Sequence, residues 1–253
     1  MDTAVVITRP ADQADELLGQ VKDMGLDVRH HPLIDITRFE DDDSAAARSI
    51  RQAILNIDQY QAVIAISQNA AESGLSWLDD YWPQHPVGIR WYAVGPTTAE
   101  SLRQAGLPVE MPVDQFDSEG VLALPSLQAV DDEKILIWRG VGGRETLANI
   151  LRERGAQVDY AELYERRQID WAAQDWERTL RSSPVLVLSS GQALAIAQQQ
   201  VPDIATRVRA IIVPSERVAT YAREQGCADV VVAASARNED TLHSLRAWFA
   251  ANR

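Results

Sequence analysis

The sequence contains one strand–helix–strand pattern twice, and this duplication limits the possible folds more than any other feature. The apolar run Val5-Val6-Ile7 precedes apolar residues at helical spacing up to Met24 and then a glycine. The same plan returns later without a gap: Arg9 aligns with Arg139, Leu17 with Leu147, Gly25 with Gly155, Val28 with Val158 and Leu33 with Leu163. Helix stripe, terminal glycine and strand ends would hardly coincide by chance, which indicates an internal duplication.

A second pair of segments repeats another plan. Residues 62–70 and 185–193 each contain an apolar run, a polar turn and a helix start. Residues 91–99 and 211–219 repeat this plan, and the helices that follow them are expected to end at Gly106 and Gly226. Apolar β-branched runs that alternate with helices predict parallel sheets covered on both faces. Two copies therefore predict an α/β protein with two similar doubly wound lobes.

The duplication does not decide which segments pair. Each lobe could be contiguous, or the first segment could pack with the last. Residues 37–59 and 167–183 are more polar and weakly patterned. They are the candidate crossings between the lobes.

Charge and cysteine content exclude several classes of partner. The net charge of −13 argues against nucleic acid and against an anionic membrane surface. No run has the length of a membrane-spanning helix, and the N-terminal residues lack the basic region of a signal peptide. The single cysteine, Cys227, excludes an internal disulfide and suits a reducing compartment. We expect a cytoplasmic protein without a nucleic-acid or membrane partner.

No motif predicts a metal or a cofactor. The histidines lack metal-ligand spacing, and no GxSxG motif occurs. Asp41-Asp42-Asp43 is more typical of a solvated surface or a helix start than of a cation site. The sequence from Gly140 to Gly143 begins like a dinucleotide-binding loop, but Glu145 stands where the third glycine should be. A glycine turn that can approach an anionic ligand is the better interpretation.

Polar side chains follow the predicted strands, where ligands bind in doubly wound sheets. They are hydroxyl, amide and guanidinium groups, which suit carboxylates or phosphates, and no carboxylate pair suggests an acid–base couple. Each of these residues also has an alternative role without a ligand. The serines, the asparagine and the threonines could simply cap helices. Arg9 and Arg139 could form surface ion pairs, and Tyr164 could be a packed aromatic residue. The candidate ligand-binding residues are Arg9, Ser67, Asn69, Thr97, Thr98, Arg139, Arg144, Ser190, Ser215 and Arg217.

Seven short motifs resemble the uroporphyrinogen-III synthase family in their order and spacing, over essentially the whole chain. They are Thr8-Arg9-Pro10, His31-Pro32-Leu33-Ile34, Ser67-Gln68-Asn69-Ala70, Val94-Gly95-Pro96-Thr97-Thr98-Ala99, Phe116-Asp117-Ser118-Glu119-Gly120, Tyr164-Glu165-Arg166 and Ser215-Glu216-Arg217-Val218-Ala219. The resemblance implies a discontinuous first lobe, residues 1–36 and 172–253, and a second lobe, residues 37–171. It also implies two antiparallel linker strands, near 31–37 and 161–167, and a cleft between the lobes.

The resemblance further implies a reaction. The family converts hydroxymethylbilane, a linear tetrapyrrole, with loss of water, inversion of the last pyrrole ring and closure of the macrocycle, without a cofactor or metal. Tyr164 matches the family tyrosine proposed to assist loss of the hydroxyl. Thr98, Ser67, Asn69, Ser190 and the turn Ser215–Arg217 match residues of the cleft. The family pattern also suggests a monomer.

The chain departs from the family pattern at a few positions. Only the serines persist of the usual Phe-Thr-Ser strand ends, Val218 replaces a common threonine, and Pro214 is expected within a strand. Two other classes of protein remain as alternatives. A two-lobed binding protein for a small anionic ligand would share the fold but carry an export signal, and a regulatory or scaffold protein would expose a large apolar face.

Overall fold

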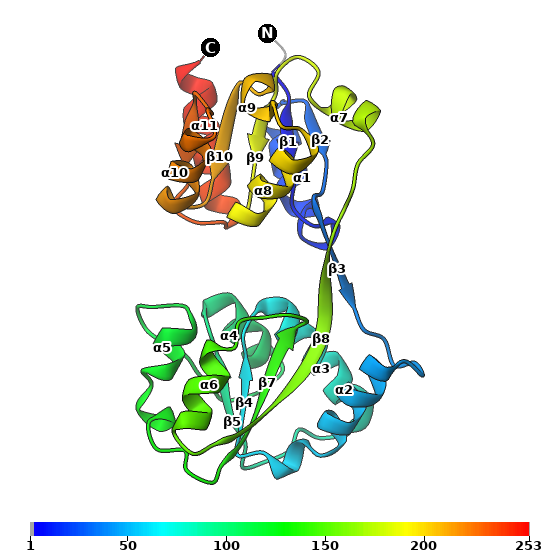
Figure 1. Cartoon of the computed structure of the whole chain (residues 1–253), viewed down its shortest axis with the longest axis vertical. Coiled ribbons are helices and arrows are strands. Elements are labelled where there is room, and N and C mark those ends of the chain that lie inside the picture. Colours follow the sequence, from blue (N-terminus) through cyan, green and yellow to red (C-terminus); the bar gives the residue numbers. More distant parts are fainter. Residues whose placement is uncertain (1–2, 253) are drawn as a thin grey trace. The chain divides into compact units, whose positions relative to one another are not determined.

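The computed structural model describes residues 3–252, which form two compact units. The first unit takes in the chain up to Ile36 and again from Arg167 onward, and the second runs from Thr37 to Arg166 (Figure 1). The change between units at Arg166 and Arg167 lies five residues before the predicted boundary at 171 and 172. Among the described residues, no helix is long and apolar enough to cross a membrane.

The first unit is built on one sheet with the strand order β11-β10-β9-β1-β2, and each adjacent pair is parallel. Its strands are β1 (Val5–Ile7), β2 (Val28–His30), β9 (Val185–Val187), β10 (Ala210–Val213) and β11 (Val230–Val232). Its helices are η1 (Ala11–Gln13), α1 (Asp15–Asp23), α7 (Ala173–Thr179), α8 (Gly191–Gln200), α9 (Ile204–Arg207), α10 (Glu216–Glu224) and α11 (Asn238–Ala251).

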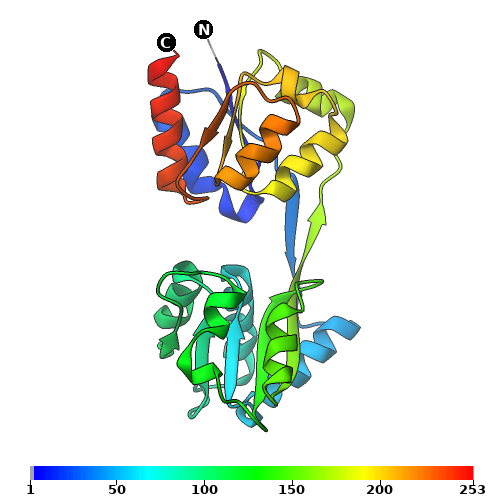
Figure 2. The ribbon, with the colours of Figure 1, turned by 60° about the vertical axis from the view of Figure 1, so that its left-hand side comes forward.

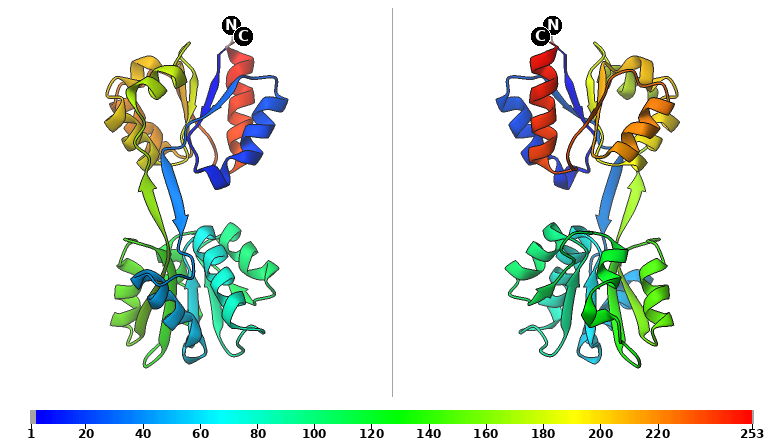
Figure 3. Two further views of the ribbon diagram at one scale, coloured as in Figure 1. Left: turned by 90° about the vertical axis from the view of Figure 1, so that its right-hand side faces the viewer. Right: turned by 90° about the vertical axis from the view of Figure 1, so that its left-hand side faces the viewer.

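Alternating side chains of this sheet are buried on both of its faces. Val5 and Ile7 pack in a core with α1 and α11, whereas Val6 packs in a second core with α7, α8 and α10. Figure 3 shows these two helical layers, with α1 and α11 on one side of the strands and α8 and α10 on the other. The predicted parallel sheet covered on both faces is therefore confirmed for this unit.

The second unit has a six-stranded sheet with the order β3-β8-β7-β4-β5-β6. Its strands are β3 (Ile34–Arg38), β4 (Ala62–Ala65), β5 (Arg90–Ala93), β6 (Val109–Glu110), β7 (Lys134–Gly140) and β8 (Gln157–Gln168). Its helices are α2 (Ala45–Leu55), η2 (Ile57–Gln59), α3 (Gln68–Tyr81), α4 (Pro96–Gln104), α5 (Ser118–Leu122), η3 (Pro125–Leu127) and α6 (Thr146–Glu153). Ile64 and Ile137 pack with α5 and α6, while α3 lies against β7 on the other face.

The two sheets correspond strand for strand. Under the sequence alignment, β1 corresponds to β7, β2 to β8, β9 to β4, β10 to β5 and β11 to β6, so the order of the five strands is the same in both units. The glycines that align after the helices all have positive φ, which favours glycine: Gly25 (75°), Gly106 (81°), Gly155 (92°) and Gly226 (88°). The internal duplication predicted from the sequence is confirmed.

The strands β3 and β8 are neighbours and run from one unit into the other (Figures 1 and 2). In the first unit Ile169 donates a backbone hydrogen bond to Leu33 (3.0 Å), and in the second Phe39 donates one to Leu163 (3.1 Å). The partner numbers rise on one strand as they fall on the other, which is an antiparallel pairing.

Three expectations about local structure are wrong. Residues 37–59 are not mainly a crossing, because they contain α2, whose Ala47, Ile50 and Ile54 are buried. Residues 167–183 contain α7 of the first unit. Pro214 does not interrupt a strand, because β10 ends at Val213. Each of these helices buries one face against its unit, Ala47, Ile50 and Ile54 in α2 and Trp176 and Thr179 in α7, while its other residues are polar or lie outside the core.

His31 lies in an aromatic cluster of the first unit, and we expect it to make the stability of the protein sensitive to acid. Its ring stacks on Trp171 at a centroid distance of 4.3 Å, Thr179 contacts its Nδ1 at 3.0 Å, and its buried Nε2 has no partner in residues 3–252. Burial lowers the pKa of His31 to about 4, against a smaller opposing effect of Asp175.

The unfolded chain takes up this proton near pH 6.5, so stability is complete above pH 6.5 and falls as the pH drops toward 4. The wild type should lose about 2.5 kcal/mol more than His31→Gln between pH 7.5 and pH 4.5. Urea unfolding of both proteins at these two pH values measures the difference. Equal losses would show that His31 does not titrate in this range.

Candidate functional site

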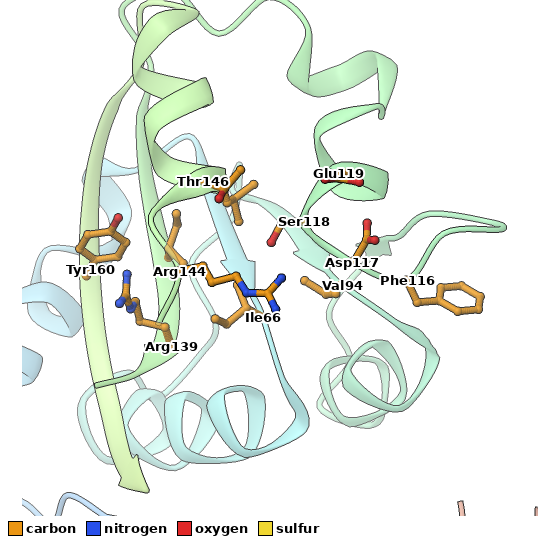
Figure 4. A pocket seen from close by; sticks show the side chains of 12 residues that line it. Ile66, Val94, Phe116, Asp117, Ser118, Glu119, Arg139, Arg144, Thr146 and Tyr160 are labelled. Carbon is orange, nitrogen blue, oxygen red and sulfur yellow. The ribbon is translucent and has the colours of Figure 1, made fainter. Parts of the chain in front are cut away.

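A pocket of about 300 Å³ lies in the second unit at the carboxyl ends of β4, β5 and β7 (Figure 4). Apolar side chains of these strands and of α6 form one part of its wall, and polar groups from the loops before α5 and α6 form the other. The lining residues are Ile66, Val94, Phe116, Asp117, Ser118, Glu119, Ile137, Arg139, Arg144, Thr146, Leu147 and Tyr160. An apolar wall with few polar groups is typical of a small-molecule site.

Tyr164 lies on β8 with only 3% of its surface exposed. Its Oη lies 3.0 Å from Oγ of Ser67, and Arg166 donates to Oη at 3.3 Å. Opposite it, β7 has a register shift between Arg139 and Gly140, so that Gly140 pairs with Tyr164 directly. A bulge of this kind changes the direction of a side chain. Here it places the ring of Tyr164 against Gly140, which has no side chain.

Ser67 caps α3, as the capping alternative expected. Its Oγ accepts a hydrogen bond from the backbone of Ala70 at 3.1 Å. Ser190 caps α8 in the same way, with the same 3.1 Å distance from Ala193. Ser67 differs from Ser190 because it also contacts the Tyr164 hydroxyl. In the second unit Ser67 therefore both caps α3 and contacts Tyr164, although neither residue is among those that line the pocket.

Arg139 is buried and engaged within its own loop. The guanidinium donates to the carbonyl oxygens of Gly140 (3.2 Å) and Gly143 (2.6 Å) and to the carboxylate of Glu145 (2.8 Å). It also lies 4.4 Å from the centre of the Tyr160 ring. The ion pair considered as an alternative is therefore present, with Glu145 as partner, but the guanidinium is buried, since only 2% of Arg139 is exposed. Its contacts instead fix the turn between β7 and α6, in which Gly142 has a φ of 71°.

Arg9, at the matching position of the first unit, is also buried rather than a surface residue. It donates to Asn238, to the carbonyl oxygen of Ala236 and to Thr241, and so holds the segment that leads into α11. Burial lowers the pKa of Arg9, and nearby Glu16 opposes this effect. The duplicated arginines thus share a structural task in the two units.

Arg144 is the exposed arginine of the pocket. Figure 4 shows its side chain extending into the pocket toward Ser118. Within residues 3–252 it makes no hydrogen bond or ion pair. Hydrogen bonds from Gln115 and Gly120 lower the pKa of Asp117, and the charge of Arg144 adds to this effect. A guanidinium that makes no hydrogen bond within the described residues and lies beside an apolar wall suits a ligand carboxylate.

The other predicted residues are distributed over both units. In the second unit, Thr98 on α4 and Asn69 on α3 are buried, whereas Thr97 is exposed. In the first unit, Ser215 precedes α10 without a side-chain capping bond, and Arg217 is exposed. Of the predicted residues, Arg139 and Arg144 line the pocket, and Ser67 contacts Tyr164.

Sequence reasoning missed several groups around the site. Asp117 caps α5 through the backbone of Gly120 (2.9 Å), and Tyr160 lines the pocket beside Arg139, whose guanidinium carbon lies 4.4 Å from the centre of its ring. The Asp-Ser-x-Gly pattern at 117–120 carries a capping signal that could have identified the start of α5. Arg166 could have been found from strand alternation, because it shares a face with Tyr164 two residues earlier.

Gly140→Ala should impair the site more than the fold. A Cβ at Gly140 would lie 2.7 Å from Cζ of Tyr164, so the ring must move and Oη must leave Ser67. We expect kcat to fall about tenfold or more, with a loss of about 1–2 kcal/mol in the free energy of unfolding. Steady-state kinetics and urea unfolding measure the two effects. An active variant with wild-type kcat would show that the ring position does not matter.

The two units share one doubly wound topology, and the first is formed by two separate segments of the chain. The second has a pocket with hydrogen-bond donors at the carboxyl ends of its strands. These features define a class of duplicated α/β proteins. Comparison with known proteins narrows this class. The family model described as uroporphyrinogen-III synthase HemD matches residues 15–243. The chain belongs to this family, whose members are hydro-lyases of tetrapyrrole biosynthesis.

Individual relatives agree over almost the full length. The chain is 32% identical to uroporphyrinogen-III synthase of Salmonella typhimurium over 251 residues, which cover 96% of this chain and 100% of the relative. It is also 32% identical to the enzyme of Escherichia coli, with the same two coverages.

Two crystal structures share the fold at 15% identity. A mutant uroporphyrinogen III synthase of Thermus thermophilus matches with a TM-score of 0.65 over 97% of this chain and 98% of its own. The Helicobacter pylori enzyme matches with a TM-score of 0.60 over 97% of this chain and 99% of its own.

Proposed function

We propose that this chain converts hydroxymethylbilane to uroporphyrinogen III. The reaction removes the terminal hydroxyl as water, inverts the last pyrrole ring and closes the macrocycle. Family membership over nearly the whole length, with 32% identity to two synthases, is the observation that carries the proposal. The predicted linear tetrapyrrole substrate follows from it.

Tyr164 is proposed to give its phenolic proton to the departing hydroxyl. It is a buried hydroxyl held by Ser67 and Arg166 at the second unit's strand ends. The remaining work is positioning, because a reactive bilane cyclises readily and the protein must favour one geometry. This chemistry needs no metal or cofactor.

Substrate carboxylates are proposed to meet exposed or polar donors. Arg144 in the second unit and Arg217 in the first have exposed guanidiniums, while Thr97, Thr98, Asn69, Ser190 and Ser215 supply hydroxyls and an amide. Arg139 and Arg9 are proposed to hold the loops that carry these donors, since their guanidiniums already bind protein groups. A monomer in the cytoplasm remains the proposed state.

Product analysis tests the proposed function. Purified protein is incubated with hydroxymethylbilane, the product is oxidised, and the porphyrin isomers are separated. Formation of the inverted isomer supports the proposal. Only the non-inverted isomer, as in a control with heat-unfolded protein, would contradict it.

A further inference from the structure

The Tyr164 hydroxyl lies between two polar partners in the second unit. Ser67 Oγ is 3.0 Å from Oη, and Nη2 of Arg166 is 3.3 Å from the same atom. The guanidinium carbon of Arg166 also lies 5.7 Å from the centre of the Tyr164 ring. Two side chains from different strand ends therefore converge on one buried oxygen.

The possible proton arrangements are few. An arginine can only donate, so Arg166 occupies one lone pair of Oη. Ser67 Oγ already accepts from the backbone of Ala70, which leaves its own hydrogen free to turn toward Oη. Before proton transfer Tyr164 can donate to a ligand or to Ser67, and after transfer both neighbours can donate to the phenolate.

The surroundings strengthen this arrangement. Ser67 stands at the N-terminus of the 14-residue helix α3, whose dipole favours negative charge there. Gly140 leaves room for the ring in this position, because a Cβ there would lie 2.7 Å from Cζ of Tyr164. Only 3% of Tyr164 is exposed, so little water competes with these two donors.

We propose that Arg166 and Ser67 are positioning residues that stabilise the negative charge left on Tyr164 Oη when it protonates the leaving group; this rests on the proposed function. The phenolic proton passes to the hydroxymethyl oxygen while the carbon–oxygen bond breaks. The electron pair of that bond stays on the oxygen, which departs as a water molecule, and the bilane becomes a cation. When the macrocycle closes, the ring system loses one proton, which returns to Oη. The net reaction is loss of one water.

The experiment uses the full chain with three single variants and two matched controls, and it repeats Arg166→Gln in a Tyr164→Phe background. Arg166→Gln and Ser67→Ala remove the two donors, and Arg166→Lys keeps the charge. Arg38→Gln is the arginine control, because Arg38 is an exposed residue paired with Glu72 in the same unit. Ser44→Ala is the capping control, because Ser44 accepts from Ala47 at the same 3.1 Å and lies at the start of α2.

We expect Arg166→Gln and Ser67→Ala each to lower kcat about tenfold, with KM changed less than about twofold. Lysine at 166 should recover most of the loss, and both controls should keep wild-type kcat. In a Tyr164→Phe background, Arg166→Gln should have no further effect, because its contribution passes through Oη.

Three results would overturn the inference. They are unchanged kcat in both donor variants, a rise in KM alone for Arg166→Gln, or an undiminished effect of Arg166→Gln in the Tyr164→Phe background. The isomers that the wild type forms show whether the proposed function itself fails, independently of the roles of Arg166 and Ser67. A wild type that forms the inverted isomer leaves the function standing even if Arg166 proves dispensable.

Discussion

Tyr164→Phe should lower kcat by about a hundredfold or more while the protein stays folded. Phenylalanine keeps the ring that packs against Gly140 but removes the hydroxyl shared by Ser67 and Arg166. Without that proton donor, departure of the hydroxyl depends on solvent. Steady-state kinetics with hydroxymethylbilane measure kcat and KM separately.

The fold of this variant serves as its control. Loss of one hydroxyl should cost about 1 kcal/mol in the free energy of unfolding, measured with urea. A second tyrosine variant, Tyr60→Phe, removes a hydroxyl that binds Asp159 elsewhere in the second unit and should keep wild-type kcat. Unchanged kcat in Tyr164→Phe would remove Tyr164 from any catalytic role.

Gly74→Ala should destabilise the second unit by about 3 kcal/mol. A Cβ at Gly74 in α3 would lie 2.5 Å from Cδ2 of Trp138, a fully buried side chain of β7. Trp138 cannot move freely because its ring also packs edge-on against Trp91 at 5.3 Å. The helix and the strand must separate, and a lower midpoint of thermal unfolding reports the cost.

Gly19→Ala is the matched control for this prediction. Gly19 lies in α1, is exposed, and an added Cβ would meet nothing within 4 Å. Alanine should stabilise that helix by about 0.5–1 kcal/mol. If both variants unfold at the wild-type midpoint, close packing of α3 on β7 is not a constraint on this fold.

Much of the fold could be predicted because the chain repeats itself. Apolar runs and terminal glycines mark strands and helix ends at matched positions, and Gly25 and Gly155 show the same backbone conformation. Capping by Ser67 and Ser190 followed from their place before a helix. These features depend on residues that are close in sequence, so periodicity and residue type are enough to predict them.

The rest depended on contacts between distant residues. Arg139 was expected to meet a ligand, but its guanidinium binds Gly143 and Glu145 within its own turn. The register shift that sets Gly140 opposite Tyr164 has no signature in either segment alone. Such features depend on how two strands pair. The residue pattern of one strand does not specify its register with the neighbouring strand.

The isomer ratio across a series of protein concentrations tests the central claim most directly. Hydroxymethylbilane is divided among samples with rising amounts of wild-type protein, and the oxidised porphyrins are separated. The proposed synthase predicts that the inverted isomer rises with protein concentration until it dominates, as catalysis outpaces spontaneous closure. A product that remains the non-inverted isomer at every concentration would contradict the assignment.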